Sequence, residues 1–262
     1  MPNKKIGLAL GSGGPRGIAH VGVIKWLLEN SINPEIIAGT SIGAVIGSFF
    51  AAGYKIENIE NEVLSISKKL IFKYIKPSLR RGAMINPKGV KTYFEKYFSN
   101  VNIEDLALPF AAVATNQETG DAVRFTKGSV TDAIMASSAA LFAFPPYIIN
   151  GERYVDGVLS EPVPAKTAKQ IGAEKIIAID VRPGNESKNN KPPKSVTGIF
   201  LKSYNISVNN LIKAQLSMEP DSLLLRPEIP SNFLKAENSS RLLIDCGYSI
   251  MEENKNKILS FL

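Results

Sequence analysis

A serine flanked by glycines is the first feature of this chain that could do chemistry. Ser41 lies in the sequence Gly-Thr-Ser-Ile-Gly at residues 39–43. The mostly apolar residues 35–38 before it predict a buried strand, and the mostly apolar residues 44–52 after it predict a buried helix. A sharp strand-to-helix turn exposes the serine hydroxyl above a helix N-terminus and leaves room only for glycines around it. The pattern predicts Ser41 as a nucleophile supported by Gly39 and Gly43. The alternative is that the glycines only let the strand pack on the helix.

The candidate base for such a serine is a carboxylate, because the chain offers only one histidine. His20 precedes Ser41 and lies in the apolar run 18–24, which is typical of a core residue rather than of a catalytic triad. Asp156 follows a predicted hairpin whose turn is Asn150-Gly151, and Gly157 after it allows another backbone to approach closely. Asp180, at the end of another predicted strand, is the rival, and an ordinary Asp-Gly turn is the structural alternative for Asp156.

A glycine-rich loop follows the first predicted strand. Residues 11–17 have the sequence Gly-Ser-Gly-Gly-Pro-Arg-Gly. They fit neither the dinucleotide-binding fingerprint nor the phosphate-binding P-loop, because the loop lacks residues that each of these motifs requires. Successive N–H groups at a helix N-terminus form a nest for an anion. The loop therefore predicts an oxyanion hole for a tetrahedral intermediate, built from Gly11, Ser12, Gly13 and Gly14.

The order of the apolar runs predicts an α/β fold. Short runs at residues 4–10, 35–40, 109–116, 174–180 and 222–226 alternate with helical patterns, which is typical of a largely parallel sheet covered by helices on both faces, a three-layer sandwich. Residues 15–29, 196–218 and 239–261 are among the predicted helices, and the polar, proline-rich residues 183–195 predict a flexible surface loop. Loops after neighbouring parallel strands meet at one sheet edge, so the glycine loop and Ser41 are expected to be neighbours.

Length and cysteine content favour one domain in a reducing compartment. The 262 residues suffice for a single domain, 1–262, in which residues 55–100 are expected to form a helical cap or lid. Cys246 is the only cysteine, so no intrachain disulfide is possible. The apolar run 6–10 is too short for a signal peptide, and the uncharged stretches 36–54 and 133–151 are better explained as buried elements than as membrane spans. A cytoplasmic protein is expected.

Four segments together resemble the bacterial patatin-like phospholipases. They are residues 11–23, residues 39–43, a middle section (114–120, 136–139 and 144–146) and residues 154–157. The resemblance spans about residues 5–180, and its order and spacing are more specific than any single motif. Two positions depart from the family pattern. Ser12 replaces a common glycine without removing an N–H, and Val158 replaces a usual Gly or Ala, which alters packing behind Asp156.

The resemblance implies a patatin-like fold and a serine lipid acyl hydrolase of the phospholipase A or lysophospholipase type. In such an enzyme Ser41 and Asp156 form a catalytic dyad, with no histidine, metal or other cofactor, and the substrate is a phospholipid or another fatty-acyl ester. Arg16 either braces the glycine loop, which we favour because a guanidinium makes several bonds at once, or binds a lipid phosphate. The alternative function is a non-catalytic lipid- or anion-binding protein on the same fold.

The positive charge of the chain is concentrated in one segment. The chain carries 31 basic and 24 acidic residues, a net charge of +7, and residues 68–96 contain nine basic residues against one acid, Glu95. Basic and aromatic residues interleaved in this way favour docking on an anionic membrane surface, here the inner membrane face, but a solvated helical face explains them equally well. No nucleic-acid-binding motif is present. The residues predicted to contact the membrane are Lys68, Lys69, Lys73, Arg80 and Arg81.

Overall fold

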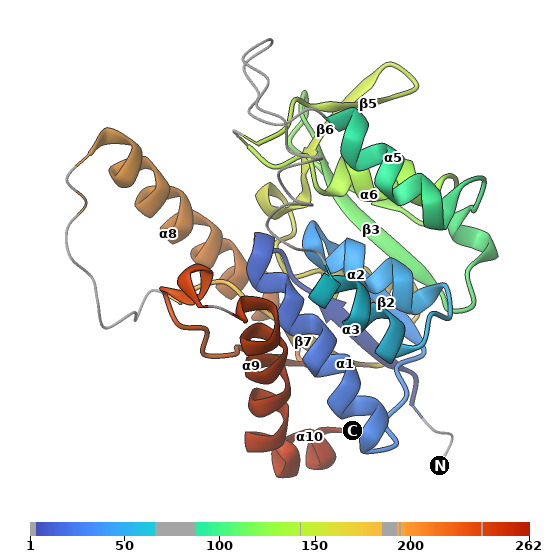
Figure 1. The fold of residues 1–262 in the computed structure, drawn as a ribbon, viewed down its shortest axis with the longest axis vertical. Coiled ribbons are helices and arrows are strands. Elements are labelled where there is room, and N and C mark those ends of the chain that lie inside the picture. The colour runs from blue at the N-terminus through green and yellow to red at the C-terminus, as the bar shows by residue number, and fades with distance from the viewer. Residues whose placement is uncertain (1–3, 66–86, 142, 185–192, 194, 237) are drawn as a thin grey trace.

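A mixed, mostly parallel sheet forms the centre of the protein (Figure 1). The computed structural model describes residues 4–65, 87–141, 143–184, 193, 195–236 and 238–262. Eight strands of this part of the chain pair in the order β5-β6-β3-β2-β1-β7-β8, with β4 also paired to β3. The five predicted strands are confirmed and are parallel: β1 (Ile6–Leu10), β2 (Ile36–Thr40), β3 (Phe110–Asn116), β7 (Lys175–Ile179) and β8 (Ser222–Leu225).

Three antiparallel strands extend the sheet beyond β3. The predicted hairpin is confirmed as β5 (Tyr147–Ile149) and β6 (Glu152–Asp156), and its turn residues Asn150 and Gly151 both have positive φ, 52° and 86°. Such φ values give a tight turn whose twist matches the paired strands. The strand β4 (Ala122–Phe125) was not predicted, because its four residues are only partly buried and carry no clear alternation. Since β6 pairs with β3, the hairpin carries Asp156 to the same end of the sheet as Ser41.

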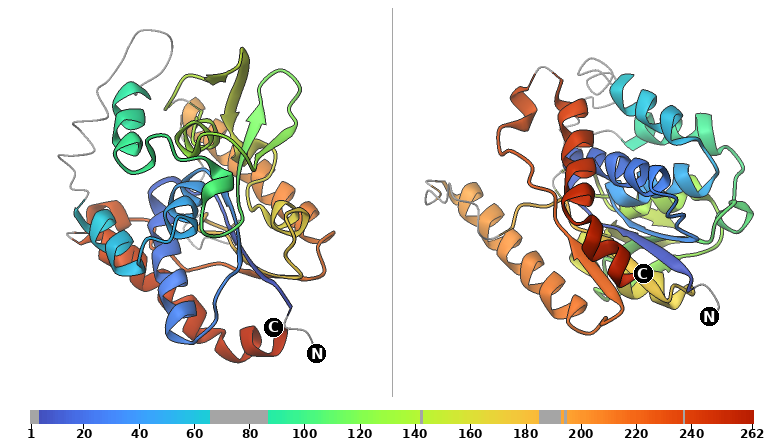
Figure 2. Two further views of the ribbon diagram at one scale, coloured as in Figure 1. Left: turned by 90° about the vertical axis from the view of Figure 1, so that its right-hand side faces the viewer. Right: turned by 90° about the horizontal axis from the view of Figure 1, so that it is seen from below.

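Helices cover both faces of the sheet, so the predicted three-layer sandwich is confirmed. On one face, Leu8, Leu10 and Ile37 pack with helices α1 (Ala19–Glu29), α2 (Ile42–Ala51), α3 (Ile56–Ser65), α5 (Pro87–Phe98), α6 (Val130–Ser137), α9 (Ser239–Glu253) and α10 (Lys255–Phe261). On the other face, the alternate residues Ala9 and Ala38 pack with α7 (Ala165–Gln170) and α8 (Val196–Leu216). Figure 2 shows α8 and α1 on opposite sides of the sheet.

Short irregular turns modify two of the predicted helices. The helix predicted from residue 15 begins as a 3₁₀ turn, η1 (Gly14–Ile18), before α1. The last predicted helix consists of two helices, because the helical conformation is interrupted at Asn254 between α9 and α10. Further 3₁₀ turns are η2 (Ile103–Asp105), η3 (Gly157–Leu159) and η4 (Phe233–Lys235). Of these turns, η1 and η3 border the candidate site.

The segment predicted as a cap is described only at its two ends, α3 and α5. Both ends pack into the main core: Phe94 and Phe98 of α5 are buried, and Glu60 of α3 pairs with Lys25 of α1 at 3.0 Å. Residues 66–86, with Lys68, Lys69, Lys73, Arg80 and Arg81, lie outside the described residues, as does most of the loop 183–195. The lid and the membrane-contact residues stay predictions. Within the described ranges, no helix is both long and apolar enough to cross a bilayer.

Candidate active site

Ser41 lies at the junction of β2 and α2 in a strained backbone conformation. Its φ of 57° and ψ of −124° are rarely adopted by residues other than glycine, and such strain is typical of functional turns. The residue is the N-cap of α2 and is 8% exposed. Its side chain therefore stands at the positive end of the helix dipole, where developing negative charge is stabilised.

The structure brings Asp156 into direct contact with Ser41. The Ser41 Oγ donates a hydrogen bond of 2.6 Å to Asp156 Oδ2, and the backbone N–H of Val158 donates to Asp156 Oδ1 at 2.9 Å. Asp156 is 3% exposed, and this burial raises the pKa of its carboxyl group to about 6, against the opposing effects of the two hydrogen bonds and the charge of Arg182. A carboxylate with a pKa close to neutrality is suited to accept and return a proton.

The glycine loop lies against the Ser41 turn, but not all of its N–H groups are free. The N–H of Gly11 donates to Ile179 O at 2.9 Å, and the N–H of Ser12 donates to Pro162 O at 2.9 Å. For Gly13 and Gly14 no intramolecular acceptor is found within the described residues. Of the four predicted oxyanion-hole donors, only Gly13 and Gly14 thus have N–H groups available in the described part of the chain, while Gly11 bonds to β7 and Ser12 bonds to the segment before α7.

The supporting residues lie around this contact. Gly39 is the penultimate residue of β2 and packs beneath α2, and Gly157 follows Asp156 against the carbonyl of Val113. Arg16 of η1 lies over the ring of Phe233, with 5.0 Å between its guanidinium carbon and the ring centroid. The rival carboxylate Asp180 instead accepts a hydrogen bond from Arg226 Nε at 2.8 Å.

Gly43 marks the closest approach between the Ser41 turn and the first strand. A Cβ at this position would lie 2.0 Å from the Leu10 carbonyl oxygen and 2.9 Å from that of Gly11. Both obstacles are backbone atoms and cannot move aside as a flexible side chain would. This contact holds the Ser41 turn against the glycine loop.

We expect Gly43→Ala to destabilise the protein by at least about 2 kcal/mol and to lower the rate of ester hydrolysis, because the turn must separate from the glycine loop. Thermal unfolding and hydrolysis of a short-chain ester measure the two effects. The matched control is Gly184→Ala, where a Cβ meets no atom within 4 Å. Equal stability and activity of the two variants would contradict this role for Gly43.

Ser137 is a site residue that sequence reasoning did not identify individually. Its hydroxyl donates to Val113 O and accepts the N–H of Ser41 at 2.8 Å. The Ser41 N–H is therefore committed to holding the turn. Ser137 belongs to the small-residue motif 136–139 at the end of α6, so the motif was visible, but nothing in its spacing indicated this contact.

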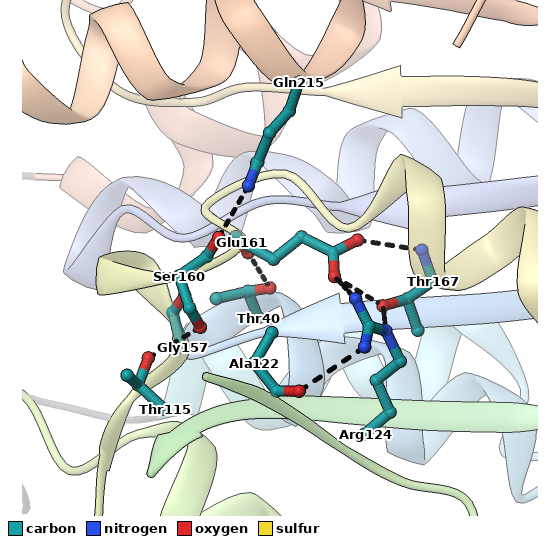
Figure 3. Close-up of polar contacts among 9 residues, drawn as sticks. All are labelled: Thr40, Thr115, Ala122, Arg124, Gly157, Ser160, Glu161, Thr167 and Gln215. Carbon is teal, nitrogen blue, oxygen red and sulfur yellow. Dashed lines mark hydrogen bonds and ion pairs between the residues drawn. The ribbon is translucent and has the colours of Figure 1, made fainter. Parts of the chain in front are cut away.

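A buried polar cluster supports the backbone on both sides of the dyad (Figure 3). The carboxylate of Glu161, which is 1% exposed, accepts hydrogen bonds from Thr167 N–H and Thr167 Oγ1, each at 2.8 Å, and from Arg124 Nη2 at 2.9 Å. Its backbone oxygen accepts the hydroxyl of Thr40, the residue before Ser41, at 2.8 Å. The cluster thereby ties the end of β2 to the segment after Asp156.

The same segment is held from two further sides. Thr115 Oγ1 donates to Asp156 O at 3.0 Å and lies 2.7 Å from Ser160 Oγ. Gln215 of α8 donates through Nε2 to Ser160 O at 2.6 Å, as Figure 3 shows. Glu161 could not be identified from the sequence, since a single glutamate before a proline has no spacing that marks it as buried.

We expect Glu161→Ala to lower the free energy of unfolding by about 3 kcal/mol, because it leaves Arg124 and Thr167 without their buried acceptor. Chemical denaturation of the purified variant measures this loss. The control is Glu118→Ala, whose side chain is 68% exposed and pairs with Arg153 at the surface. A loss at Glu161 no larger than at Glu118 would contradict the role of the cluster.

His20 supports the glycine loop from within α1. It is fully buried, and its Nε2 donates to Gly11 O at 2.8 Å. Burial lowers the pKa of the imidazole to about 4, with the hydrogen bond opposing the shift, so His20 is neutral at physiological pH. His20 therefore contacts the glycine loop through this bond.

The fold and the buried serine–carboxylate contact are typical of α/β proteins that carry a serine at a sharp turn between a strand and a helix. Comparisons with known proteins identify the family. The model of the patatin-like phospholipases matches residues 8–169, and the chain belongs to this family. The predicted family and its fold are confirmed.

Relatives and solved structures agree with this assignment. An uncharacterized NTE family protein of Mycobacterium tuberculosis is 33% identical over 183 residues, covering 70% of this chain and 50% of that protein. Lysophospholipase NTE1 of Candida albicans is 32% identical over 189 residues, covering 69% of this chain and 13% of that protein. The chain thus spans half or less of the length of these relatives. The crystal structure of VipD from Legionella pneumophila shares the fold, with a TM-score of 0.56 at 14% identity, covering 98% of this chain and 67% of VipD.

Proposed function

We propose that this chain hydrolyses carboxylic esters of lipids, as a phospholipase A or lysophospholipase, through an acyl-Ser41 intermediate. The observation that carries the proposal is the 2.6 Å hydrogen bond from Ser41 Oγ to a fully buried carboxylate. Family membership and relatives named lysophospholipase support the lipid ester as substrate. A binding protein without catalysis would have no use for a strained serine aligned with a base.

The mechanism has two acyl-transfer steps. Asp156 takes the proton of Ser41 Oγ as that oxygen attacks the ester carbonyl carbon, and the N–H groups of Gly13 and Gly14 stabilise the resulting oxyanion. The intermediate collapses to acyl-Ser41, and the alcohol leaves with the proton from Asp156. Asp156 then accepts a proton from water as the water oxygen attacks the acyl carbon, and it returns this proton to Ser41 Oγ as the bond to the acyl group breaks and the fatty acid leaves.

Product analysis tests this function directly. The purified chain is incubated with a mixed lipid extract, and mass spectrometry follows released fatty acids and deacylated lipids. We expect free fatty acids together with lysophospholipid or glycerophospho-alcohol products. Absence of any ester cleavage, with lipid bound nevertheless, would favour the lipid-binding alternative.

Contact with an anionic membrane through residues 68–81 remains a proposal, which sedimentation with anionic and with neutral vesicles would test.

A further inference from the structure

The guanidinium group of Arg182 is a buried cation that forms no ion pair with any described residue. Arg182 lies shortly after β7 and is 6% exposed. Its Nη2 donates to Asn205 Oδ1 of α8 at 2.8 Å, but its Nη1 is buried and has no acceptor within the described ranges. Buried charges in proteins are normally paired, so this free nitrogen indicates a binding group for an anion.

The neighbouring carboxylate does not neutralise Arg182. Asp180 Oδ1 accepts the backbone N–H of Arg182 at 3.1 Å, and its Oδ2 accepts Nε of Arg226 at 2.8 Å. Arg226 follows β8 directly, and its Nη2 is also buried without an acceptor in the described part of the chain. Two guanidinium groups thus share one carboxylate. The charge of Arg182 also acts on the carboxylate of Asp156, so the arginines carry no surplus charge. Two guanidinium nitrogens nevertheless have no acceptor among the described residues, and guanidinium groups bind phosphate oxygens well.

Arg182 and Arg226 lie after the carboxyl ends of β7 and β8, at the same end of the sheet as the Ser41–Asp156 dyad. Strand β7 is the neighbour of β1, which leads into the glycine loop. Val181, next to Arg182, packs on that loop: a Cβ on Gly13 would lie 2.4 Å from Val181 Cγ2. The charge of Arg182 also acts on Asp156, whose pKa it lowers against the effect of burial. These two observations place Arg182 beside the glycine loop and within the electrostatic influence of Asp156.

We propose that Arg182, assisted by Arg226, binds the phosphate group of a lipid headgroup and so selects phospholipid esters over neutral esters. The inference rests on the ester hydrolysis proposed above. A headgroup phosphodiester offers oxygen acceptors for the two guanidinium nitrogens that lack one among the described residues. Free phosphate has the same chemistry, so the test must separate the two sources.

The selectivity between two substrates tests this site. For each protein, kcat/KM is measured for a short-chain, monomeric lysophosphatidylcholine and for the monoacylglycerol with the same chain. The selectivity is kcat/KM for the lysophospholipid divided by kcat/KM for the monoacylglycerol. In Arg182→Gln this selectivity should fall at least about tenfold. In Arg182→Lys it should fall less, because lysine keeps the charge of arginine but not its forked geometry. The control Arg153→Gln, at a side chain 60% exposed, should leave the ratio unchanged. A merely structural role of Arg182 would lower both activities and leave their ratio intact.

The outcomes separate this inference from the function on which it rests. If the wild-type chain cleaves neither ester, the proposed function is wrong. If it cleaves both and Arg182→Gln keeps the wild-type ratio, ester hydrolysis stands and the phosphate site is wrong.

A second experiment uses only the wild-type chain, so it decides even if Arg182→Gln fails to fold. Glycerol 3-phosphate and inorganic phosphate are each added during monoacylglycerol cleavage. Competitive inhibition, stronger for glycerol 3-phosphate, supports a headgroup site. Inhibition by inorganic phosphate alone, or no inhibition by either, overturns it.

Discussion

Ser41→Ala is expected to abolish ester hydrolysis, with kcat/KM falling by about 10⁴- to 10⁶-fold, the range seen when a catalytic nucleophile is removed. No acyl-enzyme can form without the hydroxyl oxygen. The fold should survive, because among the described residues the Ser41 hydroxyl bonds only to Asp156. Initial rates on a short-chain p-nitrophenyl ester measure the loss, and circular dichroism checks the fold.

Ser48→Ala is the matched control for this variant. Ser48 lies on the same helix and is fully buried, but its hydroxyl bonds only the carbonyl of Val45 within that helix. It should keep nearly full activity. Hydrolysis by Ser41→Ala at the rate of Ser48→Ala would remove Ser41 from the mechanism.

Asp156→Asn is expected to lower kcat/KM by about 10³- to 10⁴-fold, because an amide cannot accept the Ser41 proton. Asparagine keeps an Oδ1 that can accept the N–H of Val158, so the turn η3 should remain capped.

The activity of the wild-type chain should depend on pH, because Asp156 must be ionised to act as the base. Since burial raises the pKa of Asp156 to about 6, kcat/KM should rise with pH up to about 6 and level off above it. The residual activity of Asp156→Asn should lack this rise, and a wild-type profile already flat from pH 5 would contradict the assignment.

The same pKa shift makes a prediction for stability. The folded-state pKa of Asp156 lies above its unfolded value, so the folded protein binds more protons between the two values, and stability falls as pH rises from about 4 to about 6. The shift of about two pH units corresponds to about 3 kcal/mol above pH 6. Asp156→Asn lacks this ionisation and should unfold at a higher temperature than wild type at pH 8, with the difference shrinking towards pH 4. A melting temperature below wild type at pH 8 would contradict the burial argument.

The sequence could predict those parts of the fold that depend on local patterns. The five parallel strands were readable because each is a short apolar run, and all but β8 are buried on both faces. The hairpin was readable because Asn150-Gly151 is typical of a tight turn. Ser41 could be selected because few sequences place a serine between glycines at a strand–helix junction. Its partner Asp156 depended on the family resemblance, since an Asp-Gly pair alone is as typical of an ordinary turn.

The remaining features depend on contacts between distant residues. Glu161 and Arg124 are far apart along the chain, and neither residue type nor spacing indicates that they meet in a buried cluster. The oxyanion loop was predicted as four equivalent donors, but Gly11 and Ser12 donate to carbonyls of two other segments, and only the three-dimensional arrangement shows this. The buried charge of Arg182 is likewise visible only after α8 has packed beside it.

The most direct test of the Ser41–Asp156 assignment is covalent labelling with a fluorophosphonate probe, followed by tandem mass spectrometry of the tryptic peptide 26–55. This peptide contains three serines, Ser31, Ser41 and Ser48, so fragment ions must locate the adduct. We predict a single adduct on Ser41, formed far more slowly in Asp156→Asn. An adduct on another residue, or none in a preparation that cleaves esters, would contradict the account.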